Sequence, residues 1–274
     1  MTLFLSDLHL GRGTPDATRA AERDAVAVIR AHDAGLLAGG TLVLLGDVFD
    51  QYLEYRHLVP KGGPRLVGLL AELADRGVRV LYTVGNRDPW HGDYFEREIG
   101  VTVLHRPTRV ETEGVGVYLA HGDGHVGRPA RPDRARPAGI PSARLLLSPL
   151  LRAPLMARLY RMGLPGDAGF GLARWVARRF GSDGAPTSAE TAALAAEADR
   201  LLDRSDLDVV GFGHIHQAAL HAFAGGTYLN PGYWFGDRTF ARLDGATGAA
   251  ELLRWDGRAA VPLARLPLGA PAPL

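Results

Sequence analysis

Five short polar motifs follow one another along this chain, and each comes directly after an apolar run. They are Asp7-Leu8-His9, Gly46-Asp47-Val48-Phe49-Asp50, Gly85-Asn86-Arg87-Asp88, His121-Gly122-Asp123 and Gly213-His214-Ile215-His216. Carboxylate, amide and imidazole side chains are common protein ligands of divalent metals. Two close ions can clamp the attacking and leaving oxygens of a phosphoryl displacement. The motifs therefore predict a two-metal phosphoester hydrolase.

Seven of these side chains are candidate metal ligands. They are Asp7, His9, Asp47, Asn86, His121, His214 and His216. Asp7 and His9 are two residues apart, so an extended backbone would point both toward one ion. A carboxylate such as Asp47 can bridge two ions, and the Asn86 amide adds a ligand without adding charge. The mixed set favours two Mn²⁺ ions, with Fe²⁺ or Zn²⁺ as alternatives, over Mg²⁺, which prefers oxygen ligands.

Other residues of the same motifs have expected roles around the reacting phosphate. Arg87 directly follows Asn86, where a guanidinium can neutralise charge on the phosphate oxygens. We assign catalytic contacts to Arg87, Asn86 and His121. Asp50 and Asp88 are expected to orient ligand histidines, and Asp123 either does the same or holds its loop.

Each motif taken alone has a plainer interpretation. An Asp-x-His or Gly-Asp pair after a strand is usually a turn, and a histidine such as His121 is often a satisfied core residue. The occurrence of all five motifs in order, each after an apolar run, makes chance the weaker explanation of the set. His125 is the weakest candidate near the motifs.

The motifs lie in a chain whose apolar runs alternate with helical patterns. We expect strands at residues 2–6, 41–45, 78–84, 101–104, 115–120 and 208–212, and helices at 17–31, 64–76 and 188–204. This alternation predicts an α/β layered fold. In such folds the loops at the carboxyl ends of strands converge on one site, and the motifs fall on those loops. Residues 217–255 are expected to form strands of a second sheet.

Residues 126–186 interrupt this pattern and form a predicted helical lid insertion. The segment holds eleven arginines and three aspartates but no lysine or glutamate, so its net charge is +8 against −7 for the rest of the chain. Apolar runs lie among the arginines, and this basic character favours an anionic partner. The core is expected to comprise residues 1–125 and 187–260, followed by a Pro- and Ala-rich tail at 261–274.

The composition of the chain excludes several other functions. The 274 residues include no cysteine, so disulfides, thiolate metal sites and cysteine nucleophiles are ruled out. No apolar stretch is long enough to span a bilayer and no secretory signal precedes Asp7, so we expect a cytoplasmic protein. The basic segment lacks a regular stripe of basic residues with interleaved aromatics, so nucleic acid is not an expected partner. The oligomeric state is left open.

Taken together, the five motifs resemble the calcineurin-like metallophosphoesterase superfamily, whose pattern they match at every step over roughly residues 1–125 and 205–245. The resemblance implies a four-layer α/β/β/α sandwich with a dinuclear metal centre. One ion would be bound by Asp7, His9, Asp47 and His216. The other would be bound by Asp47, Asn86, His121 and His214.

A closer resemblance rests on Ser6-Asp7-Leu8-His9-Leu10, on Gly85-Asn86-Arg87-Asp88 and on the helical insertion, which are similar to the UDP-2,3-diacylglucosamine pyrophosphohydrolases of lipid A synthesis. It implies cleavage of UDP-2,3-diacylglucosamine to UMP and a lipid monophosphate, with Arg87 serving the pyrophosphate and the insertion receiving the acyl chains. It also implies peripheral contact with the anionic inner face of the cytoplasmic membrane. The alternative is a soluble metallophosphoesterase acting on nucleotides, cyclic nucleotides or other phosphodiesters. A nuclease, or a scaffold that has lost catalysis, also stays open.

Overall fold

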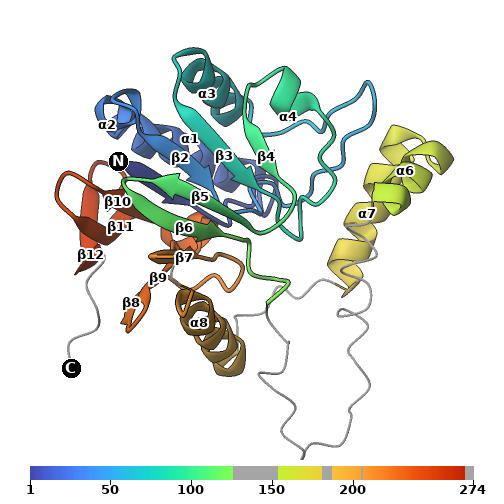
Figure 1. The fold of residues 1–274 in the computed structure, drawn as a ribbon. Coiled ribbons are helices and arrows are strands. Elements are labelled where there is room, and N and C mark those ends of the chain that lie inside the picture. Colours follow the sequence, from blue (N-terminus) through green and yellow to red (C-terminus); the bar gives the residue numbers. More distant parts are fainter. Residues whose placement is uncertain (126–153, 181–186, 205, 269–274) are drawn as a thin grey trace, which may run out of the picture.

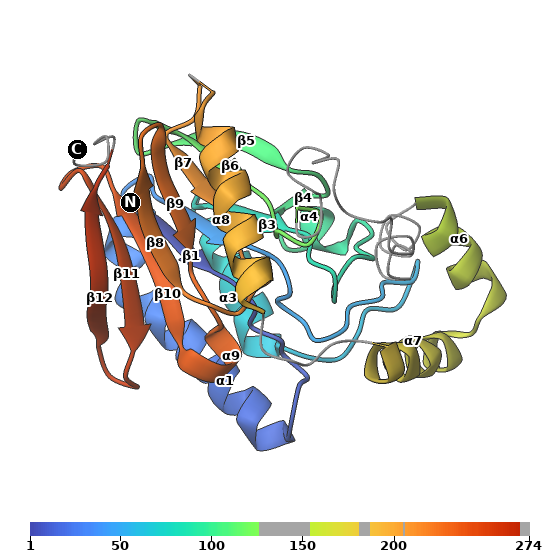
Figure 2. The same cartoon turned by 90° about the horizontal axis from the view of Figure 1, so that it is seen from below.

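Two β-sheets pack face to face, and helices cover the outer face of each sheet (Figure 1, Figure 2). This computed structural model describes residues 1–125, 154–180, 187–204 and 206–268. The arrangement is the four-layer α/β/β/α sandwich that the resemblance to the metallophosphoesterases implies.

The larger sheet has seven strands in the order β12-β11-β10-β1-β2-β3-β4. Their bounds are β1 Thr2–Leu5, β2 Thr41–Leu44, β3 Arg79–Thr83, β4 Thr102–Leu104, β10 Thr239–Asp244, β11 Ala249–Trp255 and β12 Ala260–Pro267. Strands β1 to β4 are parallel, whereas β10 to β12 are antiparallel to their neighbours. Every residue of β1 and β2 is buried, as expected of central strands that are covered on both faces.

The smaller sheet has five strands in the order β5-β6-β7-β9-β8. Their bounds are β5 Thr108–Thr112, β6 Val115–Leu119, β7 Val209–Gly211, β8 Ala219–Phe223 and β9 Gly226–Asn230. Side chains of both sheets form the apolar layer between them. The larger sheet contributes Phe4, Val43 and Leu81, and the smaller sheet contributes Val117 and Leu229. This layer fixes how the strand ends of the two sheets face each other.

Helices cover both sheets, and two of these helices begin at a side-chain cap. The outer side of the larger sheet is covered by α1 (Pro15–Ala31), α2 (Asp33–Leu37), α3 (Pro64–Asp75) and α4 (Tyr94–Arg97). The smaller sheet is covered by α8 (Ser188–Leu202), and the short α9 (Trp234–Asp237) precedes β10. The Thr14 hydroxyl accepts the Ala17 N–H at the start of α1, and Thr187 forms a capping box with Glu190 at the start of α8. Both helices start close to the positions that the sequence predicts.

The described part of the predicted insertion consists of two helices, α6 (Pro154–Gly163) and α7 (Gly166–Phe180), which lie beside the sandwich (Figure 1). They contact the core through an aromatic cluster in which Tyr160 and Phe170 pack against Leu53 and Trp90. Residues 126–153 and 181–186, with the expected boundaries of the insertion, lie outside the described residues. Those boundaries therefore stay a prediction. Among the described helices, none combines the length and the apolar character needed to cross a membrane.

Two sequence-based expectations about the last third of the chain are wrong. Strands β10 and β11 do not belong to the second sheet, because β10 pairs antiparallel with β1 of the larger sheet. The predicted tail from residue 261 is a strand as far as Pro267, since β12 pairs antiparallel with β11. Proline is tolerated there because β12 is an edge strand, where a missing N–H need not break the ladder.

Candidate metal centre

The five motifs lie on the loops that follow β1, β2, β3, β6 and β7, and these loops meet at one end of the sandwich. Main-chain hydrogen bonds join neighbouring loops. The Asp7 N–H donates to the Gly46 carbonyl at 3.1 Å, and the Gly213 N–H donates to the His121 carbonyl at 2.9 Å. Loops from both sheets are thus held together before any side chain is considered.

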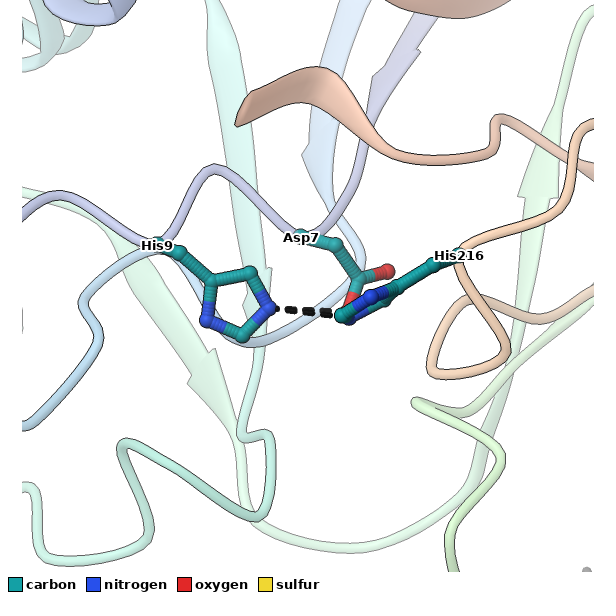
Figure 3. A group of neighbouring side chains, drawn as sticks. All are labelled: Asp7, His9 and His216. Carbon is teal, nitrogen blue, oxygen red and sulfur yellow. Dashed lines mark hydrogen bonds and ion pairs between the residues drawn. The ribbon is translucent and has the colours of Figure 1, made fainter. Parts of the chain in front are cut away.

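Asp7, His9 and His216 converge on one point (Figure 3). The Nε2 atoms of His9 and His216 are 3.0 Å apart. Asp7 Oδ1 lies 3.3 Å from His216 Nε2 and 3.6 Å from His9 Nε2. Ligand atoms about 2.1 Å from one ion stand roughly 3.0–3.4 Å apart, so this spacing suits a single divalent cation.

A second group comprises Asp7, Asp47 and His121. His121 Nε2 lies 3.5 Å from Asp47 Oδ2 and 3.1 Å from Asn86 Oδ1. The same Asp47 oxygen is 3.8 Å from His9 Nε2, so it faces both groups. Asp7 therefore belongs to both groups, and Asp47 belongs to the second group and also faces the first.

His214 and Asn86 lie at the margin of this arrangement. The His214 ring meets the His121 ring edge-on, with centroids 5.1 Å apart, and its backbone N–H donates to Asp7 Oδ2 at 3.0 Å. Asn86 is exposed, with its amide oxygen directed at His121. The structure thus brings all seven predicted ligands to one end of the sandwich, but His214 is outside both compact groups.

The backbone at the candidate ligands is left-handed rather than extended. The φ angle is 55° at Asp7, 43° at His9, 50° at Asp47, 70° at His214 and 53° at His216. The expectation of an extended backbone between Asp7 and His9 is therefore wrong, although the two side chains still converge. Residues other than glycine rarely adopt this conformation, and strain of this kind concentrates at functional sites.

Two glycines allow the loops to approach closely. A Cβ on Gly85 would lie 2.1 Å from Asp47 Oδ1, and a Cβ on Gly213 would lie 2.0 Å from Ser6 Oγ. Neither position has room for a larger residue. The glycines of these two motifs are needed because the neighbouring carboxylate loops pass directly against their backbone.

The buried carboxylates of the centre remain charged. Burial raises the pKa of Asp7, but the neighbouring His216, His9 and His121 rings together outweigh burial and hold that pKa well below its usual range. Burial also raises the pKa of Asp47, but the interactions with His121 and His9 together outweigh burial and lower that pKa. Two ionised carboxylates in one buried site provide strong attraction for cations.

The histidines respond to the same carboxylates. Burial lowers the pKa of His121, but Asp47 outweighs burial and raises that pKa to about 10. Burial likewise lowers the pKa of His9, but Asp50, Asp7 and Asp47 together outweigh burial and raise that pKa. Ligand histidines must be deprotonated, so a metal ion entering the site displaces protons from these rings.

Asp50 and Asp88 support the centre in different ways. Asp50 Oδ1 lies 3.4 Å from His9 Nδ1, which is the expected contact with a ligand histidine. Asp88 contacts no candidate ligand histidine and instead accepts the backbone N–H of Val48 at 2.8 Å and of Gly85 at 2.7 Å. The expectation that Asp88 orients a histidine is therefore not what the structure shows. It joins the backbones of two ligand loops.

The remaining predicted residues surround the centre. The Arg87 N–H donates to Asp47 Oδ1 at 2.7 Å, so the backbone of Arg87 helps to position that carboxylate. Asp123 is half-buried, and its charge helps to raise the pKa of His121. His125, the weakest candidate, pairs with Glu197 at 3.2 Å on α8.

Sequence reasoning missed two residues that contact the centre. Arg12 pairs with Asp50, with its Nε 2.9 Å from Asp50 Oδ1. The Tyr233 ring stacks on His216 with centroids 4.3 Å apart and 6° between the planes. Its position three residues beyond His9 is a signal that could have identified Arg12. No motif marks Tyr233, which precedes α9.

The donor set fits divalent metal ions. Asp7 Oδ1 is fully buried at the point where His9 and His216 converge, and it has no hydrogen-bond partner among the described residues. Such an atom requires compensation, and a cation between the three side chains would supply it. The mixed nitrogen and oxygen donors suit Mn²⁺, Fe²⁺ or Zn²⁺.

Comparisons with known proteins agree with this chemistry. No protein-family model matches the chain. The chain is similar to the UDP-2,3-diacylglucosamine hydrolase of Ralstonia nicotianae, with 35% identity over 228 residues that cover 81% of this chain and 80% of that protein. The hydrolase of the same name from Stenotrophomonas maltophilia is 29% identical over 92% of this chain and 98% of its own length. The match to the Porphyromonas gingivalis hydrolase is 38% identical and covers 45% of that protein, so this match spans about half of the relative.

Among solved structures, the E. coli phosphoesterase Yfce covers 98% of this chain and 99% of its own with a TM-score of 0.46 and 16% identity. A four-layer sandwich with an aspartate–histidine centre at its strand ends defines the chain as a metallophosphoesterase, a hydrolase of phosphoric ester bonds. Its similarity to the Ralstonia protein extends over most of both chains. The chain therefore belongs to the UDP-2,3-diacylglucosamine hydrolase family.

Proposed function

We propose that this enzyme cleaves the diphosphate bond of UDP-2,3-diacylglucosamine and releases UMP and the lipid monophosphate. One observation carries the proposal, the convergence of buried carboxylates and imidazoles from separate loops with ligand atoms 3.0–3.8 Å apart. The names of the relatives that match most of the chain support the choice of substrate.

The residues of the centre would hold two divalent ions, of which Mn²⁺ suits the donor set best. One would be held by Asp7, His9, Asp47 and His216, and the other by Asp47, Asn86, His121 and His214. When bound, two such ions supply Lewis acidity toward the phosphoryl oxygens and favour ionisation of an attacking water.

The protein's own groups prepare this chemistry. His121 Nδ1 lies 2.8 Å from the Leu45 carbonyl. A proton donated to that carbonyl keeps Nε2 as the atom that faces Asp47 and Asn86, so the ring presents its lone pair to the centre. The guanidinium of Arg87 is proposed to neutralise charge that develops on the phosphate, while its backbone N–H holds Asp47.

The insertion is proposed to receive the acyl chains. Its described helices expose large apolar side chains, namely Leu159, Met162, Leu172 and Trp175. The loop after β2 adds Leu58 and Val59. A groove of about 940 Å³ lies between α4 and α6, and its lining includes Arg56, Arg158 and Met162 together with the acidic Glu54, Asp93 and Glu98. Apolar and basic side chains in one region suit a ligand with acyl chains and a phosphate, and they support contact with an anionic membrane surface on the cytoplasmic side.

The test compares two substrates of the manganese-loaded enzyme. Turnover of UDP-2,3-diacylglucosamine in detergent micelles should exceed turnover of bis-p-nitrophenyl phosphate by several orders of magnitude in kcat/KM, and UMP should appear in equal amount to the lipid product. Hydrolysis of only the small diester, or equal kcat/KM values, would instead support the alternative of a soluble phosphodiesterase. Absence of turnover in both assays with retained metal would contradict the proposal altogether.

A further inference from the structure

Two side chains outside the five motifs complete a closed ring of contacts around one of the two ligand groups. The ring contains His9, Asp50, Arg12, Tyr233 and His216, which come from four separate loops of the chain. Each member contacts the next. Two of the five residues are candidate metal ligands, so the ring ties the positions of both histidines to the rest of the loop cluster.

The first half of the ring fixes His9. Asp50 Oδ1 is shared between Arg12 Nε at 2.9 Å and His9 Nδ1 at 3.4 Å. Arg12 therefore holds the carboxylate against the face of His9 that is turned away from the ligand group. A carboxylate on the second nitrogen of a ligand histidine fixes the orientation of the ring.

The second half of the ring fixes His216. The Tyr233 ring lies parallel to His216 and also meets His9 edge-on, with centroids 5.9 Å apart. The Arg12 Nη1 group donates to the Tyr233 hydroxyl at 3.3 Å. The guanidinium of Arg12 is thus bonded at the same time to the groups that support both histidines.

We propose that Arg12 is a positioning residue that holds His9 and His216 at the spacing one metal ion requires, acting through Asp50 and Tyr233. The inference rests on the metal centre of the proposed function. A planar guanidinium suits this task, because two of its N–H groups point in fixed directions toward different acceptors. Arg12 acts on the Asp7–His9–His216 group, because its two bonded partners, Asp50 and Tyr233, contact histidines of that group.

The loops do not depend on Arg12 for their fold. The Arg12 N–H donates to the His9 carbonyl at 3.0 Å, and the Asp50 N–H donates to the Leu10 carbonyl at 3.0 Å. Main-chain bonds of this kind remain when the side chain of Arg12 is changed. The side chain is also 19% exposed, so its replacement opens no sealed cavity. A variant at this position is expected to fold.

The experiment uses metal-free full-length protein titrated with Mn²⁺. In the unchanged protein we expect two ions per chain and the electron paramagnetic resonance spectrum of a coupled pair. Arg12→Gln should weaken one of the two binding steps by about 10–100-fold, the usual effect of losing an outer partner of a ligand. The spectrum at one ion per chain should then be that of an isolated Mn²⁺ ion. Arg12→Lys should recover only part of the Mn²⁺ affinity, because a lysine ammonium lacks the two N–H groups that a guanidinium holds in fixed directions.

Further variants test the contribution of Tyr233 to the ring of contacts and provide a control. Tyr233→Phe removes the hydroxyl and keeps the stacked ring, so we expect a smaller loss of affinity, and the double variant with Arg12→Gln should bind no more weakly than Arg12→Gln alone. Arg19→Gln is the matched control, since Arg19 lies on α1 and pairs only with the exposed Asp16 among the interactions shown here. It should bind both ions as the unchanged protein does.

The outcomes distinguish this inference from the proposed function. If the unchanged protein takes up no Mn²⁺, the metal centre itself is wrong. If it takes up two ions and Arg12→Gln takes up two with unchanged affinity, the centre stands and Arg12 has no positioning role. If Arg12→Gln weakens both steps equally and also lowers the melting temperature of the metal-free protein, the residue is merely structural, which overturns the inference as well.

Discussion

At the scale of single residues, Asp88 organises the centre without contacting an imidazole ligand. It is fully buried and accepts N–H groups from both the Asp47 loop and the Asn86 loop, together with the Tyr82 hydroxyl at 2.5 Å. Burial and the nearby Asp47 charge raise the pKa of Asp88 to about 6. One carboxylate thus sets the distance between the loops that carry two ligands.

Replacing Asp88 by Asn should therefore disturb both loops. One carboxylate oxygen becomes an NH₂ group, which faces N–H donors and leaves at least one of them without an acceptor. We expect a loss of about 1–3 kcal/mol in the free energy of unfolding and at least a tenfold loss of kcat. Urea unfolding and steady-state kinetics measure the two effects. Asp75→Asn at the exposed end of α3 is the control, and equal behaviour of the two variants would contradict the assignment.

A second residue, His91, makes stability depend on pH. Its ring is buried between Tyr52 and Tyr82, and neither nitrogen has a hydrogen-bond partner among the described residues. Burial, helped by the positive charge of His105, lowers the pKa of His91 to about 3. The folded protein therefore keeps this histidine neutral at pH values where the unfolded chain binds a proton.

The sign of the effect follows from proton binding. Above about pH 6.5 both states hold His91 neutral, and as the pH falls from there toward 3 the unfolded state is increasingly favoured. We expect His91 alone to lower the free energy of unfolding by about 2 kcal/mol between pH 7 and pH 5. His91→Phe should remove this part of the pH dependence, and the exposed His221→Phe should retain it. Parallel stability curves for His91→Phe and the unchanged protein would contradict the prediction.

At the scale of elements, the described part of the insertion packs against the core at an aromatic junction. The Tyr160 ring on α6 lies 4.7 Å from Trp90, and its hydroxyl donates to the Gly169 carbonyl of α7 at 2.6 Å. Tyr160 therefore links α6 both to α7 and to the sandwich.

Removing this ring should loosen the insertion and leave the sandwich intact. In Tyr160→Ala we expect faster proteolysis within the insertion and a fall of at least tenfold in kcat/KM for the diacylated substrate. Turnover of bis-p-nitrophenyl phosphate should change by less than about twofold. Tyr160→Phe keeps the ring and loses only the hydroxyl, so it should resemble the unchanged protein. An equal loss on both substrates in Tyr160→Ala would show that the junction serves the whole enzyme.

Local signals account for the elements that could be predicted from the sequence. The apolar runs of β1 and β2, and the helical patterns of α1 and α8, identify those elements within a few residues. The pairing of β10 with β1 was missed because no local pattern encodes contact between residues so far apart in the chain. Strand β12 was missed because its prolines are normally a signal against a strand.

The same distinction holds for the candidate site. Residue types and their order after apolar runs were enough to predict that the five motifs meet at one end of the sandwich. The contact of Arg12 with Tyr233 joins residues 221 positions apart, and no spacing rule anticipates it. The left-handed backbone at Asp7 and His9 was also missed, since side-chain alternation was assumed where the chain in fact turns at each ligand.

At the scale of the whole molecule, metal binding should stabilise the fold. The centre joins loops from both sheets, and its ligands are scattered over more than 200 residues, so an unfolded chain cannot hold the ions in this way. Each bound ion should add about 2.7 kcal/mol to the free energy of unfolding when its free concentration is 100 times its Kd.

This linkage is measurable by differential scanning calorimetry. Chelation should lower the melting temperature, and Mn²⁺ should raise it in a manner that depends on the logarithm of its concentration. Asp47→Ala lacks the carboxylate that faces both groups, so its melting temperature should respond far less. An unaltered melting temperature after complete removal of metal from the unchanged protein would contradict the coupling.

The left-handed turns at five ligand positions have a consequence for engineering. The fold bears the cost of these conformations in advance, so an incoming cation meets an already shaped cage and capture needs little rearrangement of the chain. Grafting the same short motifs onto unrelated strands would transfer the metal-ligand side chains but not the left-handed backbone angles at those positions. Such a graft should bind metal weakly unless the recipient scaffold also imposes those turns.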